Sequence, residues 1–201
     1  MKLTNYSLKV GNRVLLENVG VEFPSSVVNH ILGKNGVGKS VFAKDLMMRH
    51  PDSTVISSYS NVPFDLTFRD LLCFLRTRYE KNQIIALCGK LNVKNINKNI
   101  LIRRLSDGQK QKLKLLTFLL RDEPIIIFDE VTNALDKTTT KEIYYFINQY
   151  VRDFPGKTVI NITHNLSDLA NIPGNYFIFE DQSLHRVRDN DQAISLYLDN
   201  R

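Results

Sequence analysis

The stretch GKNGVGKS, residues 33–40, constrains the fold of this chain more than any other part of the sequence. It matches the spacing G-x-x-x-x-G-K-[ST], in which a glycine-rich backbone directs amide N–H groups at anionic oxygens. A β-rich run, residues 27–32, precedes it, and a helical stretch, residues 40–50, follows it. Because strand, loop and helix together form the phosphate-binding unit of an α/β domain, the sequence predicts a nucleoside triphosphate site.

Each residue type in this loop has its own task. The glycines let the backbone turn inward, and the helix that begins near Lys39 adds the positive end of its dipole. The Lys39 ammonium is placed to contact the β- and γ-phosphates, and the Ser40 hydroxyl is placed to bind Mg²⁺. The predicted phosphate-binding residues are Gly33, Lys34, Asn35, Gly36, Val37, Gly38, Lys39 and Ser40.

Short apolar runs alternate with helical stretches along the chain, an order typical of an α/β domain with a largely parallel sheet. Further strands are expected at residues 14–19, 54–58, 125–128, 158–162 and 176–179, and a short amphipathic helix at residues 189–200. Residues 64–121 lack the short apolar runs bounded by turn residues that mark strands, and they are predicted to be mostly helical. We therefore expect one P-loop NTPase domain, in which residues 1–62 and 122–201 form the sheet core and residues 63–121 an inserted helical subdomain.

The last helix of that subdomain begins with LSDGQ, residues 105–109. A helix start with free backbone amides and a serine hydroxyl is suited to hold an anion, although Ser106 is also the expected N-cap of its own helix. Helical periodicity predicts that one side of this helix is buried and that its lysines face outward. The expected buried residues are Leu113, Leu116 and Leu120, and the expected outward ones Lys110, Lys112 and Lys114.

Two carboxylates, Asp129 and Glu130, follow the fully apolar run at residues 125–128. Ligands of an open parallel sheet bind at the carboxyl ends of its strands, so we expect this pair beside the phosphate loop. Asp129 suits a magnesium-binding role, and Glu130 is placed to accept a proton from an attacking water. His164 closes another β-rich run; it either caps that strand or donates a hydrogen bond to a γ-phosphate.

In their order along the chain, the phosphate loop, LSDGQ, DE, NALD and the histidine resemble the nucleotide-binding subunit of ATP-binding-cassette (ABC) transporters. The likeness covers almost the whole chain. It identifies residues 33–40 with the Walker A loop, residues 125–129 with Walker B and residues 133–136 with the D-loop. By the same resemblance, Glu130 is the catalytic base, His164 the switch histidine and residues 105–109 the family signature.

The resemblance implies the ABC ATPase fold and an enzyme that binds and hydrolyses ATP with Mg²⁺. It also implies a second ABC ATPase chain, identical or different, paired head to tail with this one. The signature of each chain would then close on the γ-phosphate held by the other. The additional nucleotide-contacting residues implied in this way are Ser106, Gly108, Gln109 and Asp136.

A transport role further implies a separate polytopic membrane subunit, with the chain cytoplasmic and peripheral on the inner face of the cell membrane. The expected docking surface is the segment NVPFDLTFRDLLCFL, where Phe64, Phe68 and Leu72 either present apolar contacts or form subdomain core. The short chain favours an exporter-type subunit. The alternatives are a P-loop kinase for a small molecule, which leaves LSDGQ and NALD unexplained, and an ATPase that acts on nucleic acid.

Several positions depart from the family pattern. Asp107 replaces the first signature glycine, Lys112 an arginine, Val131 a proline and Asn133 a serine. The glutamine expected near residues 58–60 is missing, so Ser58 or Ser60 would have to take its place. Val10 stands where the family has an adenine-stacking aromatic residue, for which Tyr6 is a possible substitute. These departures lead us to expect slow turnover.

Amino-acid composition says less than the motifs do about which partners the chain binds. The 201 residues are 43% hydrophobic and 24% charged, which is ordinary for a globular domain, and no apolar run reaches the roughly 18 residues of a membrane helix. The N-terminus lacks an apolar signal core. Cys73 and Cys88 suit a reducing cytosol. The net charge of +6 fits an anionic membrane face, nucleic acid or simply a solvated basic surface, and the motifs make nucleic acid the least favoured partner.

Overall fold

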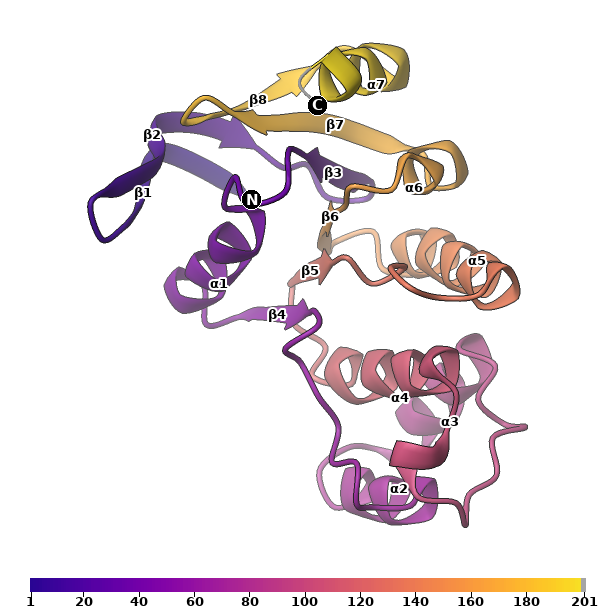
Figure 1. The fold of residues 1–201 in the computed structure, drawn as a ribbon. Coiled ribbons are helices and arrows are strands. Elements are labelled where there is room, and N and C mark those ends of the chain that lie inside the picture. The colour runs from indigo at the N-terminus through magenta and orange to yellow at the C-terminus, as the bar shows by residue number, and fades with distance from the viewer. Residues whose placement is uncertain (200–201) are drawn as a thin grey trace.

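The computed structural model describes residues 1–199 and contains a six-stranded sheet in the order β4-β5-β6-β3-β7-β8 (Figure 1). Its first five strands are parallel and only β8 is antiparallel to its neighbour, which confirms the predicted α/β class. The strands are β3 (Val28–Leu32), β4 (Ser53–Ile56), β5 (Ile125–Asp129), β6 (Thr158–Ile162), β7 (Gly174–Glu180) and β8 (Ser183–Val187).

Strands β1 (Lys2–Val10) and β2 (Arg13–Glu22) form a separate antiparallel ribbon. The expected strand at residues 14–19 is part of β2, whereas β1 was not predicted. Register shifts interrupt the β1–β2 pairing, so its buried residues Leu3, Tyr6 and Leu8 do not alternate evenly. Without a period of two, the sequence gives no clear strand signal there.

The central sheet is covered on both faces, and alternate residues of one strand serve different cores. In β5, Ile125 and Ile127 pack with the β1–β2 ribbon and α1 (Lys39–Arg49), whereas Ile126 and Phe128 pack with α5 (Lys137–Asp153) and the helical region. Figure 1 shows α1 and α5 on opposite sides of the strands. Burial on both faces explains why residues 125–128 of β5 are all apolar.

A group of helices lies at the lower end of the molecule in Figure 1. It contains α2 (Phe68–Arg76), α3 (Lys81–Lys90), the short 3₁₀ helix η1 (Ile102–Arg104) and α4 (Asp107–Leu119). Two alternatives were left open for Phe64, Phe68 and Leu72, and the structure shows that Phe68 and Leu72 are buried subdomain core. Phe64 is 45% exposed and remains available for contacts.

Helix α4 buries more of its surface than periodicity suggested. Leu113, Leu116 and Leu120 are buried as predicted, but the outward placement was wrong for Lys112 and Lys114. Lys112 is only 8% exposed and its Nζ lies 2.6 Å from Glu142 Oε2, while half-buried Lys114 donates to the Ser57 carbonyl. The helix packs between the other helices, α5 and β4, so it has two buried sides rather than one.

The chain ends with α6 (Leu166–Asn171) and α7 (Asn190–Asp199). The latter confirms the expected C-terminal helix, whose last predicted residue, 200, lies outside the described residues. Among residues 1–199, the structure contains no helix with both the length and the apolar character needed to cross a membrane.

Candidate active site

The phosphate loop connects β3 to α1, as the sequence predicted. Gly36 and Gly38 have φ angles of 77° and 120°, values that a residue with a side chain adopts only under strain. Lys39 is buried, and its Nζ donates to the carbonyls of Gly33 at 2.6 Å and Lys34 at 2.9 Å. The ammonium is therefore held inside the curve of the loop, where it can exchange carbonyl contacts for phosphate oxygens.

The Asp129 carboxylate lies beside the start of the same helix. Its side chain forms a hydrogen bond with Ser40, while its Oδ1 is buried and has no hydrogen-bond partner among the described residues. An unpartnered buried carboxylate oxygen is costly unless a ligand satisfies it. A hydroxyl and a carboxylate are the oxygen donors that Mg²⁺ prefers, so Ser40 and Asp129 fit the predicted magnesium site.

Opposite charges balance one another around the loop. Burial lowers the pKa of Lys39, and the nearby charges of Glu130 and Asp129 oppose that shift. Burial raises the pKa of Asp129, with a further contribution from Glu130, while Ser40, Lys39 and Lys44 act in the opposite direction. A cation bound at Asp129 would favour the ionised carboxylate and make the site more suitable for a polyphosphate.

Glu130 and His164 meet at the carboxyl edge of the sheet. The His164 Nδ1 lies 2.9 Å from the Glu130 Oε1, and both side chains are about one third exposed. Glu130 turns out of β5 with a φ of 56°, and its backbone N–H donates to the Ile162 carbonyl of β6. Because β5 and β6 are neighbours, the two predicted catalytic residues reach the same place from different strand ends.

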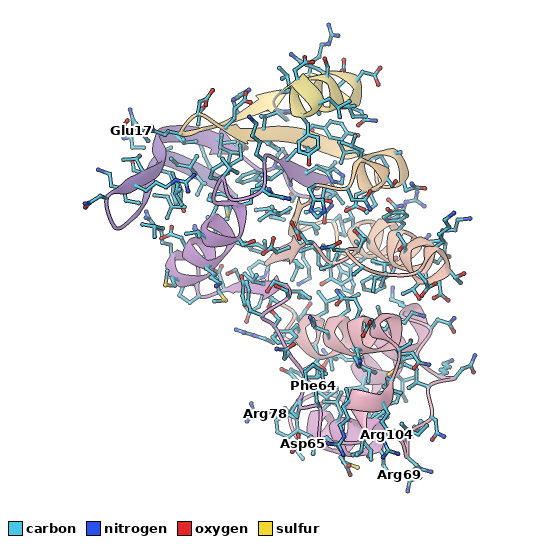
Figure 2. All side chains as sticks on the ribbon, in the orientation of Figure 1. Glu17, Phe64, Asp65, Arg69, Arg78 and Arg104 are labelled. Atoms are coloured by element: carbon cyan, nitrogen blue, oxygen red, sulfur yellow. The ribbon has the colours of Figure 1, made fainter. Side chains whose placement is uncertain are left out.

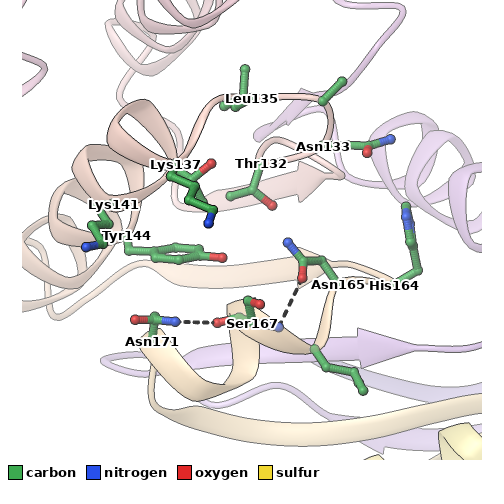
Figure 3. Close-up of a pocket in the computed structure, with 13 residues that line it drawn as sticks. Thr132, Asn133, Leu135, Lys137, Lys141, Tyr144, His164, Asn165, Ser167 and Asn171 are labelled. Carbon is green, nitrogen blue, oxygen red and sulfur yellow. Dashed lines mark hydrogen bonds between the residues drawn. The ribbon is translucent and has the colours of Figure 1, made fainter.

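An open pocket of about 620 Å³ lies between the D-loop and α6, with His164 at one side (Figure 3). A buried polar cluster lies next to it, in which Asp168 accepts hydrogen bonds from Thr132 Oγ1 and from the Tyr144 hydroxyl, both at 2.9 Å. This cluster joins α6 and α5 to the loop after β5. Sequence reasoning missed it, since nothing in the spacing marks Asp168 as buried.

The D-loop residue Asp136 has a structural task in this chain. It is the N-cap of α5, where its Oδ1 accepts from the backbone N–H groups of Thr138 and Thr139 at 2.9 Å. Several hydrogen bonds lower the pKa of Asp136, and the one from the Thr139 side chain has the largest effect. The carboxylate is exposed, and its predicted nucleotide contact stays a prediction.

The signature residues form the expected cap of α4. Ser106 Oγ accepts from the Gln109 N–H at 3.2 Å, and Gln109 Oε1 accepts from the Ser106 N–H at 3.1 Å. Asp107 turns outward and pairs with Lys110 at 3.1 Å, so its carboxylate is held by its own helix. Within residues 1–199, no hydrogen bond or ion pair joins residues 105–109 to the phosphate loop.

Gly108 brings the start of α4 against the start of α5. A methyl group added at this position would lie 2.5 Å from Thr139 Oγ1, which is itself held by Asp136. We therefore expect Gly108→Ala to destabilise the chain by about 1–2 kcal/mol through overpacking. Gly89→Ala is the matched control, because a methyl group added there would meet only Lys94 Cε, at 4.0 Å. This substitution should raise the free energy of unfolding by about 0.5 kcal/mol, since alanine favours a helix more than glycine does. Urea denaturation should show a lower free energy of unfolding for Gly108→Ala and a higher one for Gly89→Ala. Equal changes in the two variants would contradict the close approach of Gly108 to Thr139.

Two proposed substitutes for missing family residues do not fit the structure. Tyr6 is buried, its hydroxyl donates to Asp45 at 2.5 Å, and its ring packs edge-on against Phe42, so it is not available to stack on a base. Ser60 is also buried and donates to the Val55 carbonyl at 2.9 Å. Ser58 is exposed and is therefore the only one of the two serines free to face a ligand.

Comparisons with known proteins agree with this geometry. The family model described as ABC transporter matches residues 16–133. The probable peptide export ATP-binding protein YydI of Bacillus subtilis (strain 168) is 44% identical, over 98% of this chain and 99% of its own length. The energy-coupling factor transporter ATP-binding protein EcfA1 of Fusobacterium nucleatum subsp. nucleatum is 29% identical over 84% of this chain and 75% of its own.

A solved structure with the same fold is that of a bacterial Atm1-family ABC exporter with ATP bound. It matches with a TM-score of 0.80 and 19% identity, covering 99% of this chain and 40% of that one. The chain thus spans less than half of the exporter polypeptide, and this likeness establishes the fold alone.

The chain belongs to the ABC transporter family. It is an ATP-binding and ATP-hydrolysing subunit that uses Mg²⁺ and works with a membrane subunit and a second ATPase domain. The family membership excludes the small-molecule kinase that the phosphate loop alone had left open.

Proposed function

We propose that this chain powers the export of a peptide through a separate polytopic membrane subunit, and that it acts on the inner face of the cell membrane. The observation that carries this proposal is the 44% identity to a probable peptide export ATP-binding protein, which extends over nearly the full length of both chains. A relationship over the whole length favours a common type of membrane partner as well as a common ATPase.

In the proposed mechanism the residues of one edge of the sheet act on ATP. The phosphate loop binds the phosphates, and Lys39 exchanges its carbonyl contacts for the β- and γ-phosphate oxygens. Ser40 and Asp129 would hold Mg²⁺, which when bound would stabilise negative charge on the phosphates. Glu130 accepts the proton of the attacking water, and His164 orients the Glu130 carboxylate while its other ring nitrogen, Nε2, is directed to the γ-phosphate.

We propose that the complete site needs a second copy of the chain. The Ser106 hydroxyl, the Gly108 and Gln109 backbone and the start of α4 would then approach the γ-phosphate bound by the other copy. Two observations support this arrangement. Among the described residues no hydrogen bond or ion pair joins the signature to the phosphate loop of its own chain, and the Asp107 carboxylate is held by Lys110 of its own helix. Asp136 would lie at the same interface.

We further propose that residues 63–121 form the subdomain that receives the membrane subunit. A groove of about 310 Å³ runs between residues 57–64, α4 and the loop after β5. Phe64 lines it at the helical side and Glu130 at the sheet side. A segment seated in this groove would contact both the docking surface and the proposed catalytic base, which gives a direct path from transport to hydrolysis.

Inverted membrane vesicles test the proposed function. We expect vesicles that contain the chain and its membrane subunit to accumulate peptides from the same cells when Mg-ATP is added, as detected by mass spectrometry. Vesicles with the Glu130→Gln chain should assemble normally and accumulate none. ATP hydrolysis without any enriched peptide would sink the export of peptides while leaving the ATPase assignment intact.

A further inference from the structure

The positive charge of this chain is concentrated in one part of it. Residues 64–104 contain nine Lys or Arg and three Asp or Glu, a net charge of +6 that equals the formal net charge of all 201 residues. The rest of the chain is therefore electrically balanced. Such a distribution is the usual footprint of a surface that meets an anionic partner.

Seven of these cations gather at the helical end of the molecule, and we call them the basic tip. They come from α2, from the turn that follows it, from the loop at residues 91–101 and from η1, and all of them are exposed. Figure 2 labels several of them at the lower end of the molecule. The members are Arg69, Arg76, Arg78, Lys94, Lys98, Arg103 and Arg104.

Several contacts join these segments to one another. The Arg69 N–H donates to the Lys98 carbonyl at 2.9 Å, which joins α2 to the loop. Burial raises the pKa of the Cys88 thiol, and the charges of Lys98, Arg76 and Lys94 oppose this rise. The three cations therefore lie close to one thiol. These contacts bring Arg69, Arg76, Lys94 and Lys98 of the basic tip together around the end of α2 and the loop at residues 91–101.

The cations of the basic tip lack carboxylate partners. Within residues 1–199, none of them forms an ion pair. Asp70, the nearest acid on α2, accepts hydrogen bonds from the N–H and hydroxyl of Thr67 as part of a helix cap. Among the described residues, the seven cations therefore have no ion-pair partner, although the charge of Arg69 contributes to lowering the pKa of Asp70.

Large apolar side chains lie among these cations. Phe74 is 49% exposed and Phe64 45%, while Ile100 is 37% exposed. The Arg103 N–H donates to the Phe64 carbonyl at 3.0 Å, and the Arg78 guanidinium lies 5.1 Å from the centre of the Phe74 ring. Exposed aromatic and aliphatic side chains between cations are suited to the boundary between lipid headgroups and acyl chains.

We propose that the basic tip binds the anionic phospholipid surface of the membrane, in addition to the protein contact with the membrane subunit. Arginine recognises phosphate with paired N–H donors, and the Phe74 and Ile100 side chains would enter the headgroup layer, whereas Phe64 lines the groove proposed for the membrane subunit. Cations spread over four separate segments match a wide, fluid array of phosphates better than one acidic peptide. This proposal deepens the proposed function, because it rests on the chain acting at a membrane.

Sedimentation of the purified chain with lipid vesicles tests this proposal. We expect binding to vesicles with about one third phosphatidylglycerol, weakening as salt is raised, and little binding to phosphatidylcholine alone. The triple variant Arg69→Glu/Arg76→Glu/Arg104→Glu should bind more than tenfold more weakly, since each cation near such a surface contributes about fivefold. The corresponding Gln substitutions should show a smaller loss in the same direction.

The control variant carries the same change of charge at exposed sites elsewhere, Lys2→Glu/Lys9→Glu/Arg152→Glu, and should bind nearly as the unaltered chain does. ATP binding by every variant checks that it is folded. Equal losses in both triple variants, or equal binding to neutral vesicles, would overturn the proposal. Tighter binding to an acidic peptide or to single-stranded RNA than to the anionic vesicles would overturn it in favour of those partners. None of these vesicle-binding results depends on transport. They test the basic tip alone, and the peptide-accumulation experiment tests the proposed function separately.

Discussion

Lys39→Ala should weaken the binding of Mg-ATP by at least a hundredfold, about 2.7 kcal/mol. The reason is that this ammonium is the one cation held inside the curve of the phosphate loop in the described part of the chain, 2.6 and 2.9 Å from two of its carbonyls. Hydrogen bonds to charged groups each contribute about 1.5–3 kcal/mol, and alanine removes at least two of them. Titration calorimetry with Mg-ATP measures the loss directly.

Lys44→Ala is the matched control for this substitution. Lys44 lies on the same helix, is exposed, and stacks over the Tyr59 ring at 4.3 Å without reaching the loop carbonyls. An exposed charge contributes at most about 1 kcal/mol, so its loss should change the affinity by no more than about fivefold. Unchanged affinity in Lys39→Ala would refute the assignment of residues 33–40 to phosphate binding.

The second large effect is expected for Glu130→Gln, which should lower ATP hydrolysis at least a hundredfold and leave ATP binding intact. A general base contributes about 10²–10⁴ in rate, and the amide has no basic oxygen with which to accept the proton. It keeps the shape of the side chain and can still contact His164 Nδ1, which lies 2.9 Å from the carboxylate. Phosphate release measures the rate, and calorimetry measures the binding.

Glu123→Gln controls for the loss of a carboxylate in the same region. Glu123 lies just before β5, at the end opposite to Glu130, and pairs with Arg121 at 3.0 Å. The exchange should leave hydrolysis within about twofold, because an exposed pair contributes little. Comparable hydrolysis by the Glu130→Gln variant and the unaltered chain would remove Glu130 from the proposed mechanism.

The central part of the site could be predicted from the sequence because parallel strands place their carboxyl ends at one edge. The phosphate loop follows β3, Asp129 ends β5 and Glu130 follows it, and His164 follows β6. These three strands are neighbours in the sheet. Strand order itself is not visible in the sequence. It was therefore enough to assume that the phosphate loop and the acidic strand end belong to one sheet in order to predict that these residues form one site.

Other features depend on packing that a periodic pattern does not encode. Lys112 was expected to face solvent because one buried stripe was assumed for α4, but Glu142 of α5 covers it with a carboxylate at 2.6 Å. Asp168 is buried by Thr132 and Tyr144, which come from two other segments. Tyr6 points into the core next to Phe42 instead of toward a nucleotide. In each case the deciding partner is distant in sequence.

The most direct test of the central claim is the molar mass of the Glu130→Gln chain, measured by light scattering with and without Mg-ATP. If each ATP is held by Lys39 of one copy and Ser106 of the other, Mg-ATP should convert this variant from monomer to dimer. Adding Ser106→Arg should keep it monomeric while ATP binding persists, whereas adding Gln83→Arg, an exposed site on α3, should leave the dimer intact. A Ser106→Arg/Glu130→Gln chain that dimerises as well as Glu130→Gln alone would contradict the account.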